Sequence, residues 1–276
     1  MRTAFVLALS IIVAPAAALA RHPLVEALPV IARLEEPRGT VFILRGRLSK
    51  EMAAQAISLA RAVQRDVARR FLGEGDKSLL PPVDLCLFAT TASHRAFANA
   101  VFGDAEKHSD LGFYYPGERV VAANLGWSLG NLRHEMAHAL LGDDFPEIPS
   151  WLNEGFGALY GTAAQGKDGF FFLVNYRLKD LRAARAAGTL PDLAALAASD
   201  PRDVYGDGAP AFYGLSRYLL LFLEAQGRLR DFYVQMKAEP PTRARQVKLL
   251  ERFVDFPRFL AWTETLKMNT VPPAPR

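Results

Sequence analysis

The sequence predicts an α+β fold in which a small mixed sheet precedes a mainly helical second half. Short runs rich in β-branched and aromatic residues fall before residue 126. After residue 149, apolar residues recur at helical spacing through most of the chain. The composition agrees with a globular protein, because half of the 276 residues are hydrophobic and 22% are charged.

The sheet-forming half alternates strands with helices. Its predicted elements are a strand at 40–46, a helix at 49–73, a strand at 83–89, a helix at 91–103 and a hairpin at 112–126. Gly73 and Gly103 are expected to end the two helices. Pro116 and Gly117 mark the turn of the hairpin. Residues 21–38 contain prolines and are expected to be irregular.

The next element is a helix over residues 128–142, with Ser128 as its N-cap and Gly142 just past its end. A capped helix beginning at Ser150 follows. Further helices are predicted at 175–188, 190–199, 209–227, 228–236, 241–253 and 255–268. We therefore expect an α/β subdomain over 21–142, a helical subdomain over 143–268 and a flexible tail over 269–276.

Residues 1–20 have the pattern of a secretory signal peptide. Arg2 precedes an apolar stretch, and Ala18-Leu19-Ala20 matches an A-x-A cleavage site. An uncleaved membrane anchor is the alternative, but Pro15 interrupts the stretch and it is short for a span of about 20 apolar residues. We therefore expect a periplasmic or secreted protein with no stable membrane span after cleavage.

The charge distribution argues against a nucleic-acid-binding protein, and the cysteine content excludes a protein held by internal disulfides. The net charge is +4, and the basic residues are dispersed at helical spacings, so no nucleic-acid partner is predicted. Cys86 is the only cysteine, which rules out an internal disulfide. It lies in the apolar run VDLCLFA, where we expect a buried thiol that packs as a small hydrophobe.

The segment NLRHEMAHALLG (131–142) places His134 and His138 four positions apart on the predicted helix. Side chains at this spacing share one face, so both imidazoles can bind one ion. Glu135 points too far aside to be a ligand but lies beside that ion, where a general base belongs. The other faces of the helix are apolar, so these polar groups are expected to be buried and to need a strong partner such as zinc.

Catalytic zinc usually takes three protein ligands, and no histidine follows His138 in the chain. Glu154, in PSWLNEGFGALYG, is the favoured third ligand, since nearby glycines permit close helix packing. Its competitors in the connecting loop are Asp143, Asp144 and Glu147. Asp143 or Asp144 is expected instead to accept a hydrogen bond from a ligating imidazole.

RHEMAHALL followed by PSWLNEGFGALYG resembles the gluzincin metallopeptidases, in particular the small peptidase-MA-like domains. The likeness extends loosely over residues 83–236, and its specific part is 131–160. It implies a zincin-like fold, with helices packed on a buried HExxH helix. It also implies that His134, His138 and Glu154 bind zinc and that Glu135 activates water.

The resemblance further implies a hydroxyl donor for the oxyanion of the reaction. Tyr213 is the favoured candidate, with Tyr160 and Tyr218 as alternatives. A G-x-M-E-N signature of aminopeptidases is absent from the sequence, so recognition of a free amine is not supported. The hairpin at 112–124 is a candidate edge strand that pairs with an extended peptide.

The sequence thus favours an exported zinc metallopeptidase that hydrolyses a peptide or protein substrate. The alternatives are a non-catalytic envelope protein with a structural zinc and an amidase acting on cell-wall peptides. The two remaining internal histidines, His94 and His108, are expected at the surface. Nothing in the sequence indicates the oligomeric state.

Overall fold

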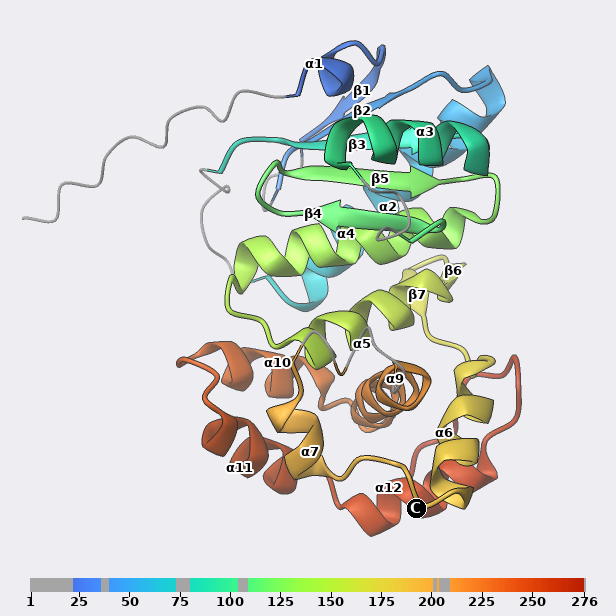
Figure 1. The fold of residues 1–276 in the computed structure, drawn as a ribbon. Coiled ribbons are helices and arrows are strands. Elements are labelled where there is room, and N and C mark those ends of the chain that lie inside the picture. The colour runs from blue at the N-terminus through green and yellow to red at the C-terminus, as the bar shows by residue number, and fades with distance from the viewer. Residues whose placement is uncertain are drawn as a thin grey trace, which may run out of the picture.

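The computed structural model describes residues 22–35, 40–72, 80–103, 109–200, 203 and 209–275, so the predicted signal segment lies outside the described residues. A five-stranded mixed sheet with its helices forms one half of the molecule, and a group of helices forms the other (Figure 1). The predicted α+β class is confirmed. Helices α4 (Leu129–Asp144) and α5 (Ser150–Gly161) lie where the two halves meet (Figure 1).

The sheet has the strand order β1-β2-β3-β5-β4. Its strands are β1 (Val30–Leu34), β2 (Phe42–Gly46), β3 (Val83–Phe88), β4 (Gly112–Tyr115) and β5 (Val120–Asn124). The three central strands run parallel, and the edge strands β1 and β4 pair antiparallel with their neighbours. The predicted hairpin is thus β4–β5, with β4 at the sheet edge.

Strand β1 and the short helix α1 (Pro23–Glu26) correct the expectation that residues 21–38 are irregular. The β1 sequence VIARL gives no clear alternation, because most of this edge strand is exposed or half-buried. Its pairing with β2 defines it as a strand. Tertiary pairing here outweighs a weak local signal.

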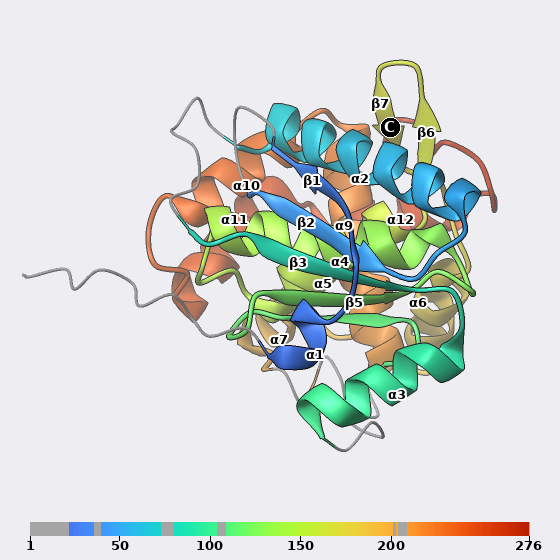
Figure 2. The same cartoon turned by 90° about the horizontal axis from the view of Figure 1, so that it is seen from above.

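Helices cover both faces of the sheet (Figure 2). Helices α2 (Lys50–Arg70) and α4 pack on one face in the main core, and α1 and α3 (Thr91–Phe102) cover the other. Side chains of β3 alternate between the faces: Leu85 and Leu87 point to the main core, Cys86 and Phe88 to the α3 side. Cys86 is fully buried as expected, and burial raises the pKa of its thiol, which keeps it protonated and unreactive.

The prediction that His94 lies at the surface is wrong. Its exposed fraction is 1%, and its ring packs edge-on against Phe88 and Phe113 with centroid distances of 5.7 Å. Helix α3 is capped by Thr90, which turns His94 and Phe97 together toward the sheet. His108 lies outside the described residues.

Helix α4 (Leu129–Asp144) contains the histidine pair. The Ser128 hydroxyl accepts a hydrogen bond from the backbone of Gly130 at 2.9 Å, which confirms the predicted N-cap. The helix continues past Gly142, contrary to prediction, and the N–H of Phe145 closes it on the Leu141 carbonyl at 2.7 Å. Glycine often follows a helix end, but a helix tolerates it in its interior at a cost of about 1 kcal/mol.

Helix α5 (Ser150–Gly161) begins one residue earlier than expected. Pro149 is its N-cap, and Ser150 is already helical and makes no capping hydrogen bond. The backbone of Pro149 has φ −58°, which a proline ring favours before a helix. The start of this helix is therefore set by proline geometry and not by a serine cap.

The second half is mainly helical, as predicted. Its helices are α6 (Arg177–Ala186), α7 (Leu193–Ala198), α9 (Ala209–Ala225), α10 (Leu229–Lys237), α11 (Arg243–Phe253) and α12 (Phe256–Thr265). Helix α9 is strongly apolar, with its residues from Gly214 to Leu223 buried, and lies in the middle of this half with the others around it (Figure 1). Among the described residues, no helix combines the length and apolarity needed to cross a membrane.

Two details of this half were not predicted. Strands β6 (Ala164–Gly166) and β7 (Gly169–Phe171) form a small hairpin whose Gly169 has φ +128°, a value that glycine readily adopts. The chain end expected to be flexible is hydrogen-bonded to the fold. The backbone of Asn269 donates to Val174 at 2.8 Å, and the Trp262 indole donates to Pro273 at 2.9 Å.

Candidate metal centre

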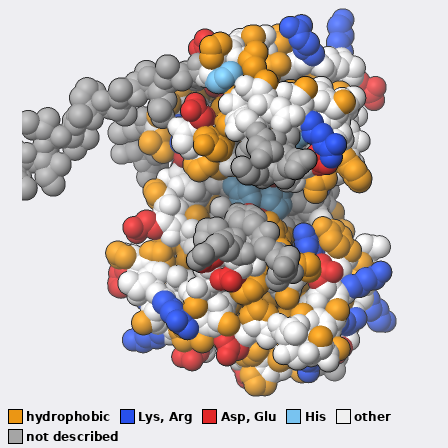
Figure 3. Space-filling model, viewed as in Figure 1, with side chains coloured by type: hydrophobic (Ala, Val, Ile, Leu, Met, Phe, Trp, Pro, Cys, Tyr) orange, Lys and Arg blue, Asp and Glu red, His pale blue; other side chains and the backbone are white. Residues whose placement is uncertain are grey.

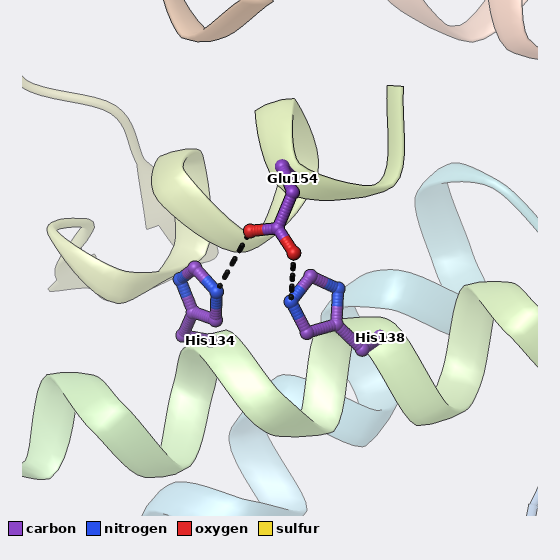
Figure 4. Close-up of side chains that lie close together, drawn as sticks. All are labelled: His134, His138 and Glu154. Atoms are coloured by element: carbon purple, nitrogen blue, oxygen red, sulfur yellow. Dashed lines mark ion pairs between the residues drawn. The ribbon is translucent and has the colours of Figure 1, made fainter. Parts of the chain in front are cut away.

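Two neighbouring helices bring three ligand-type side chains together (Figure 4). His134 and His138 project from α4 toward Glu154, which comes from α5 (Figure 4). The Nε2 atom of His134 lies 3.4 Å from one Glu154 oxygen, and the Nε2 atom of His138 lies 3.5 Å from the other. One ligand atom of each residue lies within 4.8 Å of the others, so this group could hold a metal ion.

Glycines in α5 make room for the imidazole rings. A Cβ atom at Gly157 would lie 2.7 Å from His134 Nε2 and 2.7 Å from His138 Cε1. A Cβ atom at Gly161 would lie 3.4 Å from the Cβ of His134. Any larger residue at Gly157 would occupy the space that the rings and an ion need.

Asn153 holds the ring of His138 from the side opposite the ligand atom. Its Oδ1 atom lies 3.0 Å from His138 Nδ1. The expectation that Asp143 or Asp144 has this role is therefore wrong. Asn153 precedes Glu154 on α5, and that position in a WLNEG segment is the sequence signal that could have identified it.

The three carboxylates expected in the connecting loop do not join the candidate ligand group, and Asp143 and Asp144 belong to the last turn of α4. Asp143 accepts two hydrogen bonds from the guanidinium of Arg119, at 2.7 and 2.9 Å. Asp144 accepts hydrogen bonds from a tyrosine hydroxyl at 2.7 Å and a lysine ammonium at 2.6 Å in α10. Glu147 is exposed. These ion pairs anchor the end of α4 to both halves of the molecule.

The centre is reachable from solvent on one side. The side chain of His134 is 24% exposed and that of His138 is 8% exposed. Histidine surface lies at the bottom of the hollow between the sheet half and the helical half (Figure 3). Burial lowers the pKa of His134, but hydrogen bonding to Glu154 and nearby carboxylate charge outweigh it and leave the pKa raised. Burial lowers the pKa of His138.

Glu135 lies beside this group and outside it. It is 6% exposed, and its side chain packs against the start of β4, where a Cβ atom at Gly112 would lie 3.1 Å from Glu135 Cγ and 3.3 Å from Oε1. Burial raises the pKa of Glu135 to about 7; His134 opposes this rise and the charge of Glu154 adds to it. The carboxyl group is thus poised to take and release a proton near neutral pH.

The three candidate tyrosines have different surroundings. The buried hydroxyl of Tyr160 donates to Asp66 at 2.9 Å, and that of Tyr218 donates to the Asn175 carbonyl at 2.9 Å. Both therefore have structural partners. Tyr213 lies under the guanidinium of Arg177, whose Cζ atom is 4.6 Å from the ring centroid. Its role as a donor to an oxyanion stays a prediction.

Arg177 is a residue near the centre that the sequence did not single out. Its positive charge is close enough to His134 to lower the pKa of that imidazole. In the sequence it resembles the other dispersed arginines, so no local pattern distinguishes it.

Comparisons with known proteins do not place the chain in a family. A scan against protein-family models found no match, and a search among curated proteins found no similar sequence.

Proposed function

We propose that the protein is a zinc-dependent metallopeptidase of the gluzincin type, with a peptidase-MA-like, zincin-like fold. The main support is one observation: the Nε2 atoms of His134 and His138 lie 3.4 and 3.5 Å, respectively, from the two oxygens of Glu154. Ligands bound tetrahedrally at about 2.0–2.2 Å are separated by roughly 3.3–3.6 Å. The two N–O distances, each to a different oxygen of Glu154, fall in this range and support a site of this kind.

The donor set favours zinc over other ions. Two imidazole nitrogens and one carboxylate oxygen suit zinc, whereas magnesium and calcium prefer oxygen ligands. Three protein ligands leave a fourth position open, as in catalytic zinc sites. Zinc bound in such a site lowers the pKa of a water molecule to about 7 and polarises a carbonyl group.

Glu135 is the proposed general base. It follows His134 directly on α4, is buried and does not belong to the ligand group. Its carboxylate would take the proton of the attacking water and pass it to the leaving amine. Strand β4 supports this arrangement, because its Gly112 lies against Glu135 and its outer edge, which pairs with no described strand, can pair with an extended peptide.

Two further assignments complete the proposal. Tyr213 would donate a hydrogen bond to the oxyanion that develops on the substrate carbonyl. The signal-like segment 1–20 would direct the protein to the periplasm or outside the cell. Cell-wall peptides belong among the substrates to be tested, since an amidase would use the same ligands and base.

The variant Glu135→Gln tests the proposed mechanism. The zinc-loaded protein is incubated with a peptide library that includes cell-wall stem peptides. We expect the variant to retain zinc, because its ligands are intact, and to lose about 10²–10⁴-fold in hydrolysis rate. His138→Ala is the control that should lose both zinc and activity.

Three outcomes would contradict the proposal. Loss of zinc in Glu135→Gln would contradict the role of base, and unchanged hydrolysis would do so as well. Tight zinc binding with no hydrolysis of any peptide by the parent protein would favour a structural zinc.

A further inference from the structure

Arg177, the first residue of α6, is held between two aromatic rings. Its Cζ atom lies 4.6 Å from the ring centroid of Tyr213 and 5.2 Å from that of Tyr176. Tyr213 is in the first turns of α9, so the pair of rings comes from two separate segments. Stacking of this kind restrains the guanidinium plane and leaves its N–H edges available for hydrogen bonding.

A chain of contacts links Arg177 to the His134 side of the candidate metal centre. Gly161, at the end of α5, packs against His134. The hydroxyl of Thr162, the next residue, accepts a hydrogen bond from the Asn175 amide at 3.1 Å. The Oδ1 atom of Asn175 in turn accepts the backbone N–H of Arg177 at 3.1 Å. The start of α6 is therefore held beside the centre.

The hydrogen bonding of Arg177 differs from that of a structural arginine. Arg119, for comparison, forms two hydrogen bonds to one carboxylate at 2.7 and 2.9 Å. Within the described part of the chain, the Arg177 guanidinium makes a single long hydrogen bond, 3.4 Å to Asp180. Its side chain is 24% exposed. The guanidinium thus keeps both solvent access and the capacity to bind another anion.

The position of Arg177 suits an anion that lies away from the scissile bond. A donor to the oxyanion must approach within about 2.7–3.1 Å of it. The contacts that link the backbone of Arg177 to His134 pass through Gly161, Thr162 and Asn175. A planar guanidinium matches a carboxylate, which it can bind through two parallel hydrogen bonds.

We propose that Arg177, held by Tyr176 and Tyr213, binds the free C-terminal carboxylate of the peptide substrate. The protein then cleaves peptides near their C-terminus. This inference rests on the proposed metallopeptidase function, and its test must separate the two. Side-chain carboxylates of Asp or Glu offer the same chemistry, so the test must also separate the two sources of the carboxylate.

Binding of dipeptide hydroxamates to the zinc-loaded protein, measured by calorimetry, provides that test without requiring turnover. One probe ends in a carboxylate, a second ends in a carboxamide, and a third ends in a carboxamide but has an aspartate side chain. We expect the first to bind about tenfold or more tightly than the second, since hydrogen bonds to charged groups are the strong ones. The third should bind like the second.

Variants assign the effect to Arg177. Arg177→Gln should abolish the preference for the carboxylate probe, and Arg177→Lys should keep part of it, because the charge remains and the planar fork is lost. Arg185→Gln removes the same charge from the other end of α6 and should leave the preference unchanged. Tyr213→Phe should retain the preference, and Tyr213→Ala should lower it.

Each contrary result has a distinct meaning. Equal binding of the first two probes, or a preference that survives in Arg177→Gln, overturns the role of Arg177 and leaves the metallopeptidase proposal standing. Tight binding of the third probe overturns the C-terminal assignment in favour of acidic side chains. Failure of all three hydroxamates to bind the zinc-loaded protein contradicts the open metal site and, with it, both proposals.

Discussion

The Nδ1 atom of His138 lies 3.0 Å from the side-chain oxygen of Asn153, the residue that precedes Glu154 on α5. An amide oxygen only accepts hydrogen bonds, so this contact favours the His138 tautomer with its proton on Nδ1, which leaves Nε2, on the Glu154 side, able to bind an ion. One turn of α5 thus supplies both a candidate ligand and a side chain that contacts another candidate ligand.

Replacing Asn153 by Ala should weaken zinc binding by about 10–100-fold, because the imidazole loses the partner that selects its tautomer. Competition with a chromogenic chelator measures this affinity. Asn153→Asp keeps an acceptor at the same position and should preserve the affinity. Equal zinc affinity in Asn153→Ala and the parent protein would show that the contact does not orient His138.

Gly157→Ala should abolish metal binding while the fold is retained. The added methyl group would lie 2.7 Å from atoms of both His134 and His138, closer than real Cβ contacts. The imidazole rings must then turn away from Glu154. Metal content after dialysis, with circular dichroism as the check on folding, provides the measurement.

Gly142→Ala is the matched control for that substitution. Gly142 lies inside α4, and a Cβ atom there would meet nothing within 4 Å. Alanine has the higher helix propensity, so this variant should bind metal normally and gain about 0.5–1 kcal/mol in stability. Normal metal content in Gly157→Ala would refute the packing argument.

The grouping of His134, His138 and Glu154 could be predicted from the sequence because the information for it is local. His134 and His138 are four positions apart on one helix, and this spacing alone defines their common face. The prediction that Glu154 joins them required only that the helix after the histidine helix pack closely on it. The glycines beside Glu154 indicate such close packing. The sheet was largely predictable for the same reason, since its central strands are short apolar runs.

The errors have a common origin in tertiary contacts. His94 is polar, and only the packing of α3 on the sheet shows that it is buried. Asp143 is adjacent in sequence to the motif helix, but its carboxylate is bonded to Arg119, which comes from the turn between β4 and β5. Arg177 approaches the centre from α6, and no spacing along the chain indicates that approach.

Tyr160→Phe should lower stability and leave metal binding intact. The Tyr160 hydroxyl donates to Asp66, which also forms an ion pair with Arg70 and accepts the backbone N–H of Phe170. Loss of one hydrogen bond from this buried network should cost about 1–2 kcal/mol in the free energy of unfolding. Urea denaturation measures the loss.

Tyr115→Phe is the control for Tyr160, since Tyr115 is an exposed residue of β4 and its replacement should change stability by less than about 0.5 kcal/mol. A large fall in zinc affinity or in peptide hydrolysis, with stability unchanged in Tyr160→Phe, would instead make Tyr160 part of the active centre. The structural role of its hydroxyl would then be refuted.

Metal loading should stabilise the folded protein, because the ligands come from two helices that unfolding separates. His138 on α4 and Glu154 on α5 would be cross-linked by one ion. Free zinc at a hundred times its dissociation constant contributes about 2.7 kcal/mol, which corresponds to a rise in melting temperature of roughly 5–10 °C. Thermal unfolding with zinc and with a chelator measures the difference. His138→Ala should lose the shift, since it removes a ligand, whereas Glu135→Gln should keep it. A shift that persists in His138→Ala would place the stabilising ion somewhere other than between α4 and α5.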